Sequence, residues 1–172
     1  MTDELASLEK QLKQAESTQE RIDALNALGW AIRRDDLERA FALSAEAHEL
    51  AQAESESYTR GIVESLCTQA IVALYRSEYE KALTDGLQAV HLLDEAGIQD
   101  LLPRALYATA VAYSESGNLE EALKYSYRQE QVSQSLGDKE GYAISLLVMG
   151  VIYDEQGGYA RALDMSQKGF AV

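Results

Sequence analysis

Apolar residues recur at three- and four-residue steps through most of the chain, the spacing of one face of an α-helix. Each such run ends at a short polar or glycine-containing break. The pattern therefore predicts a succession of helices with no strand between them. The predicted ranges are about 2–16, 18–34, 36–54 and 57–76, then a helix that follows a cap at Ser77 and runs to about Ala96, then 99–116, 118–135, 139–156 and 158 onward.

The breaks carry recognisable helix-start signals. Ser17 with Glu20, and Ser77 with Glu80, match the capping box, in which the serine hydroxyl and the glutamate carboxylate accept from each other's backbone amides. Asn118 with Glu121 offers a third pairing of this kind. Pro103, the single proline, fits only the first turn of its helix, where its missing N–H costs nothing.

Two landmarks repeat along these helices. The small residue of each first helix is spaced 41, 40 and 40 residues apart, and the alanine of each second helix 42, 40 and 40. Helix pairs that share a period stack into a solenoid, because one pair cannot bury its apolar stripe alone. The two sets are Gly29, Ala70, Ala110 and Gly150, and Ala40, Ala82, Ala122 and Ala162.

The sequence therefore predicts an all-α fold, a right-handed superhelical solenoid of stacked antiparallel helix pairs. We expect a single domain over 1–172. Residues 1–17 would form an N-terminal capping helix, and the repeats would span about 18–56, 57–97, 98–137 and 138–172, the last incomplete. Since no cap follows the last repeat, we expect a fragment of a longer protein whose C-terminal face, with Phe170 and Val172, dimerises or exchanges helices.

The helix pairs over about residues 18–172 resemble the tetratricopeptide repeat family, loosely in the first two pairs and most clearly in the third and fourth. Its marks are a small residue, an aromatic residue three positions later, a glycine turn, an apolar residue and an alanine. The period of 40 exceeds the family's usual value of about 34, so the resemblance is to the long-helix variety. That variety occurs in spindle adaptors, bacterial peptide-sensing regulators and arrays ahead of bacterial cyclase or kinase domains. The residues are Ala110, Tyr113, Gly117, Asn118, Leu119 and Ala122, then Gly150, Tyr153, Gly157, Gly158, Tyr159 and Ala162.

Composition narrows the classes of partner. The 29 acidic residues exceed the 15 basic ones and give a formal net charge of −14. Phosphate backbones and anionic membranes would repel such a chain, so we expect neither nucleic acid nor membrane binding. Cys67 is the single cysteine, which fits a reducing cytoplasm and rules out an internal disulfide. The polar N-terminus is not a signal peptide.

No catalytic, cofactor or metal site is expected. His48 and His91 have no second ligand at metal spacing, so we interpret them as packing or surface residues. Cys67 has no obvious activating base. The adjacent acids Asp154 and Glu155 flank a helix end and are expected to be solvated.

The resemblance places a partner-binding groove on the concave face of the first helices, beside their packed face. A stripe read there at helical spacing is richer in apolar and aromatic residues than a solvated surface needs, and such side chains are favoured anchors in binding sites. The alternative is that Trp30 and Tyr107 pack as core. The stripe comprises Asn26, Trp30, Arg33, Cys67, Ile71, Tyr75, Tyr107, Val111, Ser114, Leu147 and Val151.

These inferences predict a non-enzymatic protein-interaction and scaffolding module in the cytoplasm. Its partner would be a protein or peptide with apolar anchors. The resemblance further implies the sensory or regulatory part of a larger bacterial signalling protein. Two alternatives stay open: a receptor domain for a short signalling peptide, and a purely structural oligomerisation module.

Overall fold

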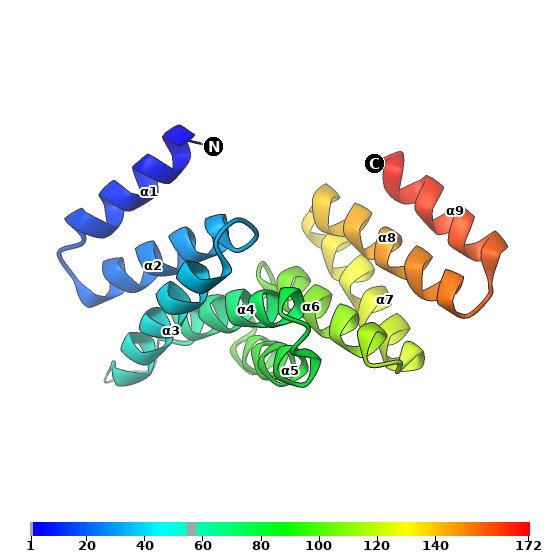
Figure 1. Cartoon of the computed structure of the whole chain (residues 1–172), viewed down its shortest axis with the longest axis horizontal. Helices are drawn as coiled ribbons and strands as arrows, with labels where there is room; N and C mark the ends of the chain where they lie inside the picture. The colour runs from blue at the N-terminus through cyan, green and yellow to red at the C-terminus, as the bar shows by residue number, and fades with distance from the viewer. Residues whose placement is uncertain (1, 55–57) are drawn as a thin grey trace. The chain divides into compact units, whose positions relative to one another are not determined.

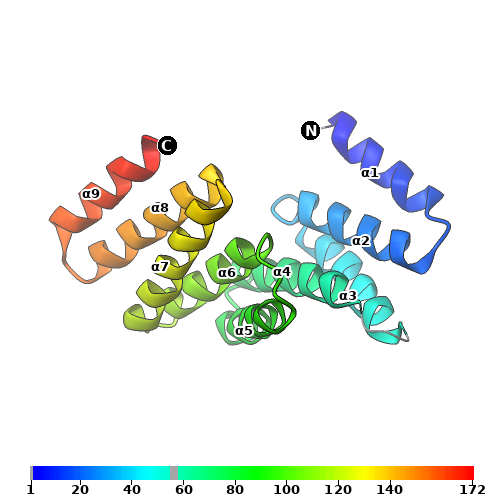
Figure 2. The same ribbon diagram turned by 180° about the vertical axis from the view of Figure 1, so that it is seen from behind.

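The structure, a computed structural model, describes residues 2–54 and 58–172 and is all-helical over those ranges. The predicted fold class is thereby confirmed. Contacts divide the chain into two compact units, residues 1–78 and 79–172, and each is described by itself (Figures 1 and 2). The predicted repeat boundary at residues 56 and 57 lies outside the described residues.

The helix bounds follow the predicted ranges closely. Unit 1 contains α1 (Thr2–Gln14), α2 (Thr18–Ile32), α3 (Leu37–Ala53) and α4 (Thr59–Tyr75). Unit 2 contains α5 (Tyr79–Ala96), α6 (Leu102–Glu115), α7 (Leu119–Leu136), α8 (Lys139–Glu155) and α9 (Tyr159–Phe170).

Helix starts are fixed by short-range hydrogen bonds. The capping box at Ser17 is complete, and the hydroxyl of Ser17 accepts from the amide of Glu20 at 3.2 Å. Asp36, Asn118 and Asp138 cap α3, α7 and α8 in the same way through their side-chain oxygens. These bonds satisfy amides that the helices leave unpaired at their N-termini. Pro103 lies in the first turn of α6, as predicted.

Five helix ends share one geometry at 20-residue intervals. Residues 77, 97, 117, 137 and 157 all have positive φ, and the amide after each bonds a carbonyl five residues back, as in Asn118 N to Tyr113 O at 2.9 Å. This is the Schellman motif, which favours glycine because glycine has no Cβ to clash. Ser77, the exception, has φ of 59°. The predicted cap at Ser77 is therefore wrong, since this residue lies in the turn that follows α4 and α5 begins only at Tyr79.

The repeat landmarks are packing positions. All four small residues of the first helices and all four alanines of the second helices are buried. Small side chains let neighbouring backbones approach, as where a Cβ added at Gly150 would lie 3.3 Å from the carbonyl oxygen of Ala162. The 40-residue spacing thus marks where each hairpin closes.

In unit 1, α1 lies over the α2–α3 hairpin. Three partly buried leucines of α1 pack on a core cluster that includes Leu28 and Ile32. The Arg39 guanidinium donates to Glu9 at 2.8 Å beside them, which holds the pKa of Glu9 below its usual range. α1 thus places an apolar stripe on the core and a polar side outward. The leucines are Leu5, Leu8 and Leu12.

In unit 2, consecutive helices pack as antiparallel neighbours from α5 to α9, and α6 also contacts α8. The last hairpin closes around a cluster of Leu146, Met149, Tyr153 and Ala162. Leu123 of α7 packs against the same cluster. α8 is therefore held between α7 and α9.

Candidate partner-binding surfaces

In unit 1 the predicted stripe has one aromatic residue on α2, Trp30, and one on α4, Tyr75. Trp30 is half-buried, and the Arg33 guanidinium lies 3.7 Å from the centroid of its ring. Arg33 also donates to the Trp30 carbonyl at 2.5 Å. Tyr75, at the end of α4, is 51% exposed. A partner that stacks on the indole must therefore compete with the Arg33 cation, whereas Tyr75 is accessible.

Three other residues of the stripe in unit 1 are buried. Asn26, Cys67 and Ile71 have exposed fractions of 2%, 1% and 4%. The Asn26 amide donates to the Gly61 carbonyl at 2.8 Å and so joins α2 to α4. α4 approaches closely here, since a Cβ on Gly61 would lie 2.6 Å from the Ile22 side chain. These residues hold helices together and do not lie on the surface in this conformation.

In unit 2 the stripe is more accessible. Tyr107 and Val111 on α6 are half-buried, as is Leu147 on α8, and Val151 is 58% exposed. Because α6 and α8 are neighbours and the residues are equivalent across a 40-residue step, they form one apolar row on two adjacent helices.

Ser114 marks the edge of this row. It is buried, and its hydroxyl donates to a carboxylate oxygen of Glu155 at 3.4 Å. The bond connects the C-terminal turns of α6 and α8. Ser114 therefore contributes to helix packing, and the accessible part of the row is apolar.

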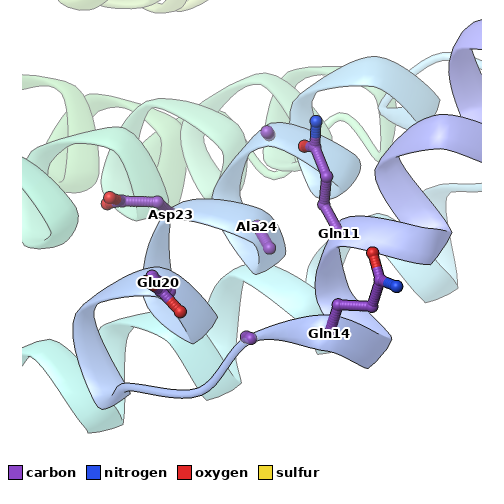
Figure 3. A pocket seen from close by; sticks show the side chains of 7 residues that line it. Gln11, Gln14, Glu20, Asp23 and Ala24 are labelled. Carbon is purple, nitrogen blue, oxygen red and sulfur yellow. The ribbon is translucent and has the colours of Figure 1, made fainter.

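A pocket of about 450 Å³ lies between α1 and α2. Gln11 and Gln14 on α1 line it together with Glu20 and Asp23 on α2 (Figure 3). The hydroxyl of Tyr58 donates to Asp23 at 2.9 Å, and burial raises the pKa of that phenol. Asp23 thus has a structural contact, and the pocket assembles no reactive pair of side chains.

One apolar face was not included in the predicted stripe. Tyr159 and Leu163 on α9 are exposed, in line with Phe170, which the sequence singled out as part of the C-terminal face. Their steps of four and seven residues place them on one side of the helix. The spacing of these residues could be read from the sequence, but the family resemblance places the groove on the first helices of the repeats and not on the second.

The described residues contain no cluster of three or more histidine, cysteine or acidic side chains arranged to hold a metal ion. The Nδ1 atom of His48 lies 2.9 Å from the hydroxyl of Ser65, and His91 pairs with Glu95 at 3.4 Å. No helix of the described chain combines the length and apolar character that crossing a bilayer requires.

Comparison with known families identifies the repeats. The family model described as tetratricopeptide repeat matches residues 101–172. The predicted resemblance is thus confirmed for the third and fourth helix pairs. No curated protein matches the sequence. The fold of these repeats is generally a non-catalytic scaffold for protein–protein interaction.

Solved structures extend the likeness to nearly the whole chain. Aspartyl phosphate phosphatase F from Bacillus subtilis is 17% identical with a TM-score of 0.78, over 93% of this chain and 42% of that protein. BtubC from P. vanneervenii is 17% identical with a TM-score of 0.79, over 99% and 72%. The TPR-like repeats of a P. anserina kinesin light chain are 16% identical with a TM-score of 0.66, over 97% and 82%. The chain thus spans less than half of the phosphatase, and at these identities the likeness shows the fold alone.

Proposed function

We propose, from the premise that residues 101–172 belong to the tetratricopeptide repeat family, that the chain binds a partner segment through apolar anchors. The observation that carries the proposal is the row Tyr107, Val111, Leu147 and Val151 on adjacent helices α6 and α8. Apolar side chains at helical spacing on two neighbouring helices fit a partner helix or an extended segment. In unit 1, Tyr75 and Trp30 supply a second aromatic contact.

The partner's chemistry follows from what the row lacks. A site for a carboxylate-rich peptide would need several inward lysine or arginine side chains, and the accessible row in unit 2 has none among its predicted members. The chain's net charge of −14 also opposes acidic ligands. An apolar segment with neutral or basic flanks fits best.

Selection of peptides from a displayed library on the immobilised full chain tests this proposal. Selected peptides should lose binding to Tyr107→Ala and Val151→Glu, which alter the row. The matched control Tyr159→Ala, on α9, should bind them normally. If the peptides bind both row variants as well as the unaltered protein, the row is not the site.

A more specific proposal concerns the cellular location and the signalling role of the protein. We infer a cytoplasmic sensory or regulatory part of a bacterial signalling protein, and the fold shared with aspartyl phosphate phosphatase F supports it. If the chain is a receptor for a short peptide, a selected peptide should reduce its radius of gyration in small-angle scattering. An unchanged radius in the saturated complex would count against a receptor and leave passive binding.

Self-assembly is the second candidate function, and the exposed apolar residues of α9 favour it. A homodimer or helix-exchanged oligomer through the C-terminal repeat would sediment at twice the chain's mass or more. Phe170→Glu should then restore the monomer, because it places a charge on the contact face. A monomer for the unaltered protein at high micromolar concentration would exclude this candidate.

A further inference from the structure

The apolar row on α6 and α8 ends at a group of carboxylates. Because consecutive helices are antiparallel, α6 and α8 run in the same direction, and their last turns lie at one end of the row. The hydroxyl of Ser114 and a carboxylate oxygen of Glu155, 3.4 Å apart, connect these two turns. Asp154 and Glu115 are the other acids of the turns, and both are exposed, as is Glu155. The row therefore ends in negative charge.

These carboxylates occupy positions that disfavour negative charge. The C-terminal end of an α-helix carries partial negative charge, so a cation is stabilising there and a carboxylate is not. Neither α6 nor α8 has a basic residue in its last turn. The ion pairs of the described residues in unit 2 involve other carboxylates than Glu115, Asp154 and Glu155. A cation supplied by a partner would relieve this repulsion.

A cation on α9 lies on the other side of α8. The Arg161 guanidinium is 5.7 Å from the centroid of the Tyr153 ring. Tyr153 is buried, and its hydroxyl lies 2.5 Å from that of Tyr127 on α7. Two helical positions span about 200°, so Tyr153 and Val151 point to opposite sides of α8. Arg161 is therefore on the α7 side of the helix, and the row keeps its acidic end.

We propose that the row selects a partner segment with a lysine or arginine close to the apolar anchor beside Val151, and that Asp154 and Glu155 bind this cation. This ligand preference rests on the proposed function of the row and adds the charge and direction of the segment. Asp154 lies three residues beyond Val151, a rise of about 4.5 Å. An extended segment advances about 3.3 Å per residue, so the basic residue would lie within about three positions of the anchor.

Two observations support a side-chain cation at this end of the row. Arg104 and Lys139, the basic residues of α6 and α8, lie in the first turns of these helices, at the opposite end. The described residues form no group of three or more acidic, histidine or cysteine side chains that could hold a metal ion. A basic residue of the bound segment therefore fits the carboxylates better than a metal ion does.

Parallel selections from the displayed peptide library test this preference. One arm uses the immobilised full chain, and the other uses Asp154→Asn with Glu155→Gln, which removes two charges at nearly constant shape. Both positions are exposed, so circular dichroism should show the variant folded. The unaltered chain should enrich peptides with lysine or arginine within three positions of an apolar residue, and the neutralised variant should enrich the apolar residues alone. Row-dependent peptides without the basic residue would overturn the preference and leave the proposed function standing.

Fluorescence anisotropy of the most enriched peptide then measures the contribution of the cation. The neutralised variant should bind the peptide about three- to tenfold more weakly at low salt. The difference should shrink at about 1 M salt, which screens charges beyond about 3 Å. Replacing the basic residue of the peptide by glutamine should cause the same loss with the unaltered chain and no further loss with the variant.

The matched control Glu140→Gln removes an exposed carboxylate at the opposite end of α8 and should leave the affinity within about twofold. Equal affinity for the unaltered chain and the neutralised variant would overturn the preference, as would an equal loss in Glu140→Gln or a loss that high salt leaves unchanged. Peptides that bind Tyr107→Ala and Val151→Glu normally, or a selection that yields no peptide, would overturn the proposed function and this preference with it.

Discussion

The first helix of unit 1 and the last helix of unit 2 treat their apolar stripes in opposite ways. α1 turns Leu5, Leu8 and Leu12 onto the α2–α3 hairpin and faces outward with polar residues. α9 packs Ala162, Met165 and Gly169 inward and faces outward with Tyr159, Leu163 and Phe170.

The difference shows what makes a terminal helix a cap. Both helices are amphipathic, but only α1 is polar on the side away from the core. A helical repeat whose outer face is polar ends an array, whereas an apolar outer face can continue one or bind a partner. Both helices pack on a neighbouring hairpin, but only α9 presents an apolar outer face on which another helix could pack.

The largest expected effect comes from matched leucine truncations. Leu28→Ala, in the core beneath α1, should lower the free energy of unfolding by about 2–5 kcal/mol, because it leaves a cavity. Leu163→Ala should change it by less than about 0.5 kcal/mol, because that side chain is exposed. Urea unfolding followed by circular dichroism measures both. A similar loss for the two variants would mean that the α9 face is already covered in solution.

Two helical glycines of unit 1 differ in the space around them, and alanine substitution should therefore affect stability differently at each. Gly61→Ala should cost about 1–3 kcal/mol, because its Cβ would lie 2.6 Å from both the Ile22 and Tyr58 side chains. Gly29→Ala should be neutral or stabilise by up to about 1 kcal/mol, since its Cβ would make ordinary contacts and alanine favours helix. The single tryptophan, Trp30, reports unfolding of this unit by fluorescence. Destabilisation by both variants to the same extent would contradict the close approach at Gly61.

A smaller effect is expected at the left-handed turn residues, which are glycine in four turns and serine at position 77. Ser77 holds a left-handed conformation that glycine adopts at 117 and 157. Ser77→Gly should stabilise the protein by up to about 1 kcal/mol, and Gly157→Ser should destabilise it by a similar amount. Thermal unfolding of the two variants measures the effects. Destabilisation by Ser77→Gly would show that the serine side chain has a role beyond the turn.

The smallest effect concerns Tyr127 on α7, which is 42% exposed and lies against Tyr153 of α8. The hydrogen bond to Tyr153, with burial second, raises the pKa of Tyr127 from 10.0 to about 12. A raised phenol pKa favours the folded state while the phenol is neutral. The stabilisation is therefore present below pH 10 and is lost as the pH rises towards about 12.

Tyr127→Phe should remove this contribution to the pH dependence. Urea unfolding between pH 9 and pH 12 should thus show a shallower decline than in the unaltered protein. The control Tyr159→Phe, on the exposed face of α9, should keep the original slope. Identical slopes in all three proteins would show that the bond between the two tyrosines does not stabilise the fold.

Sequence patterns predicted the fold because the information was local. Helical spacing gave the helix ranges, and the 40-residue landmarks gave the positions where hairpins close, all of which are buried. Ser77 was misassigned because serine is both a common cap and, more rarely, a left-handed turn residue. Its alignment with Gly117 and Gly157 was the signal that could have identified the turn.

The predicted binding stripe was less well determined, because burial depends on distant helices. Asn26 looks like a surface residue in its own helix, yet it bonds to Gly61, 35 positions away. Spacing assigns a residue to a side of its helix but does not say how far the next helix covers that side. Which accessible residues contact a partner stays a prediction.

Paramagnetic relaxation of methyl signals by a soluble gadolinium probe compares the outer faces of the two helices most directly. The account predicts strong broadening at Leu163 on α9 and weak broadening at the three α1 leucines, because Leu163 is 60% exposed and Leu5, Leu8 and Leu12 pack on the core. Equal broadening at all four leucines, or weaker broadening at Leu163, would contradict it.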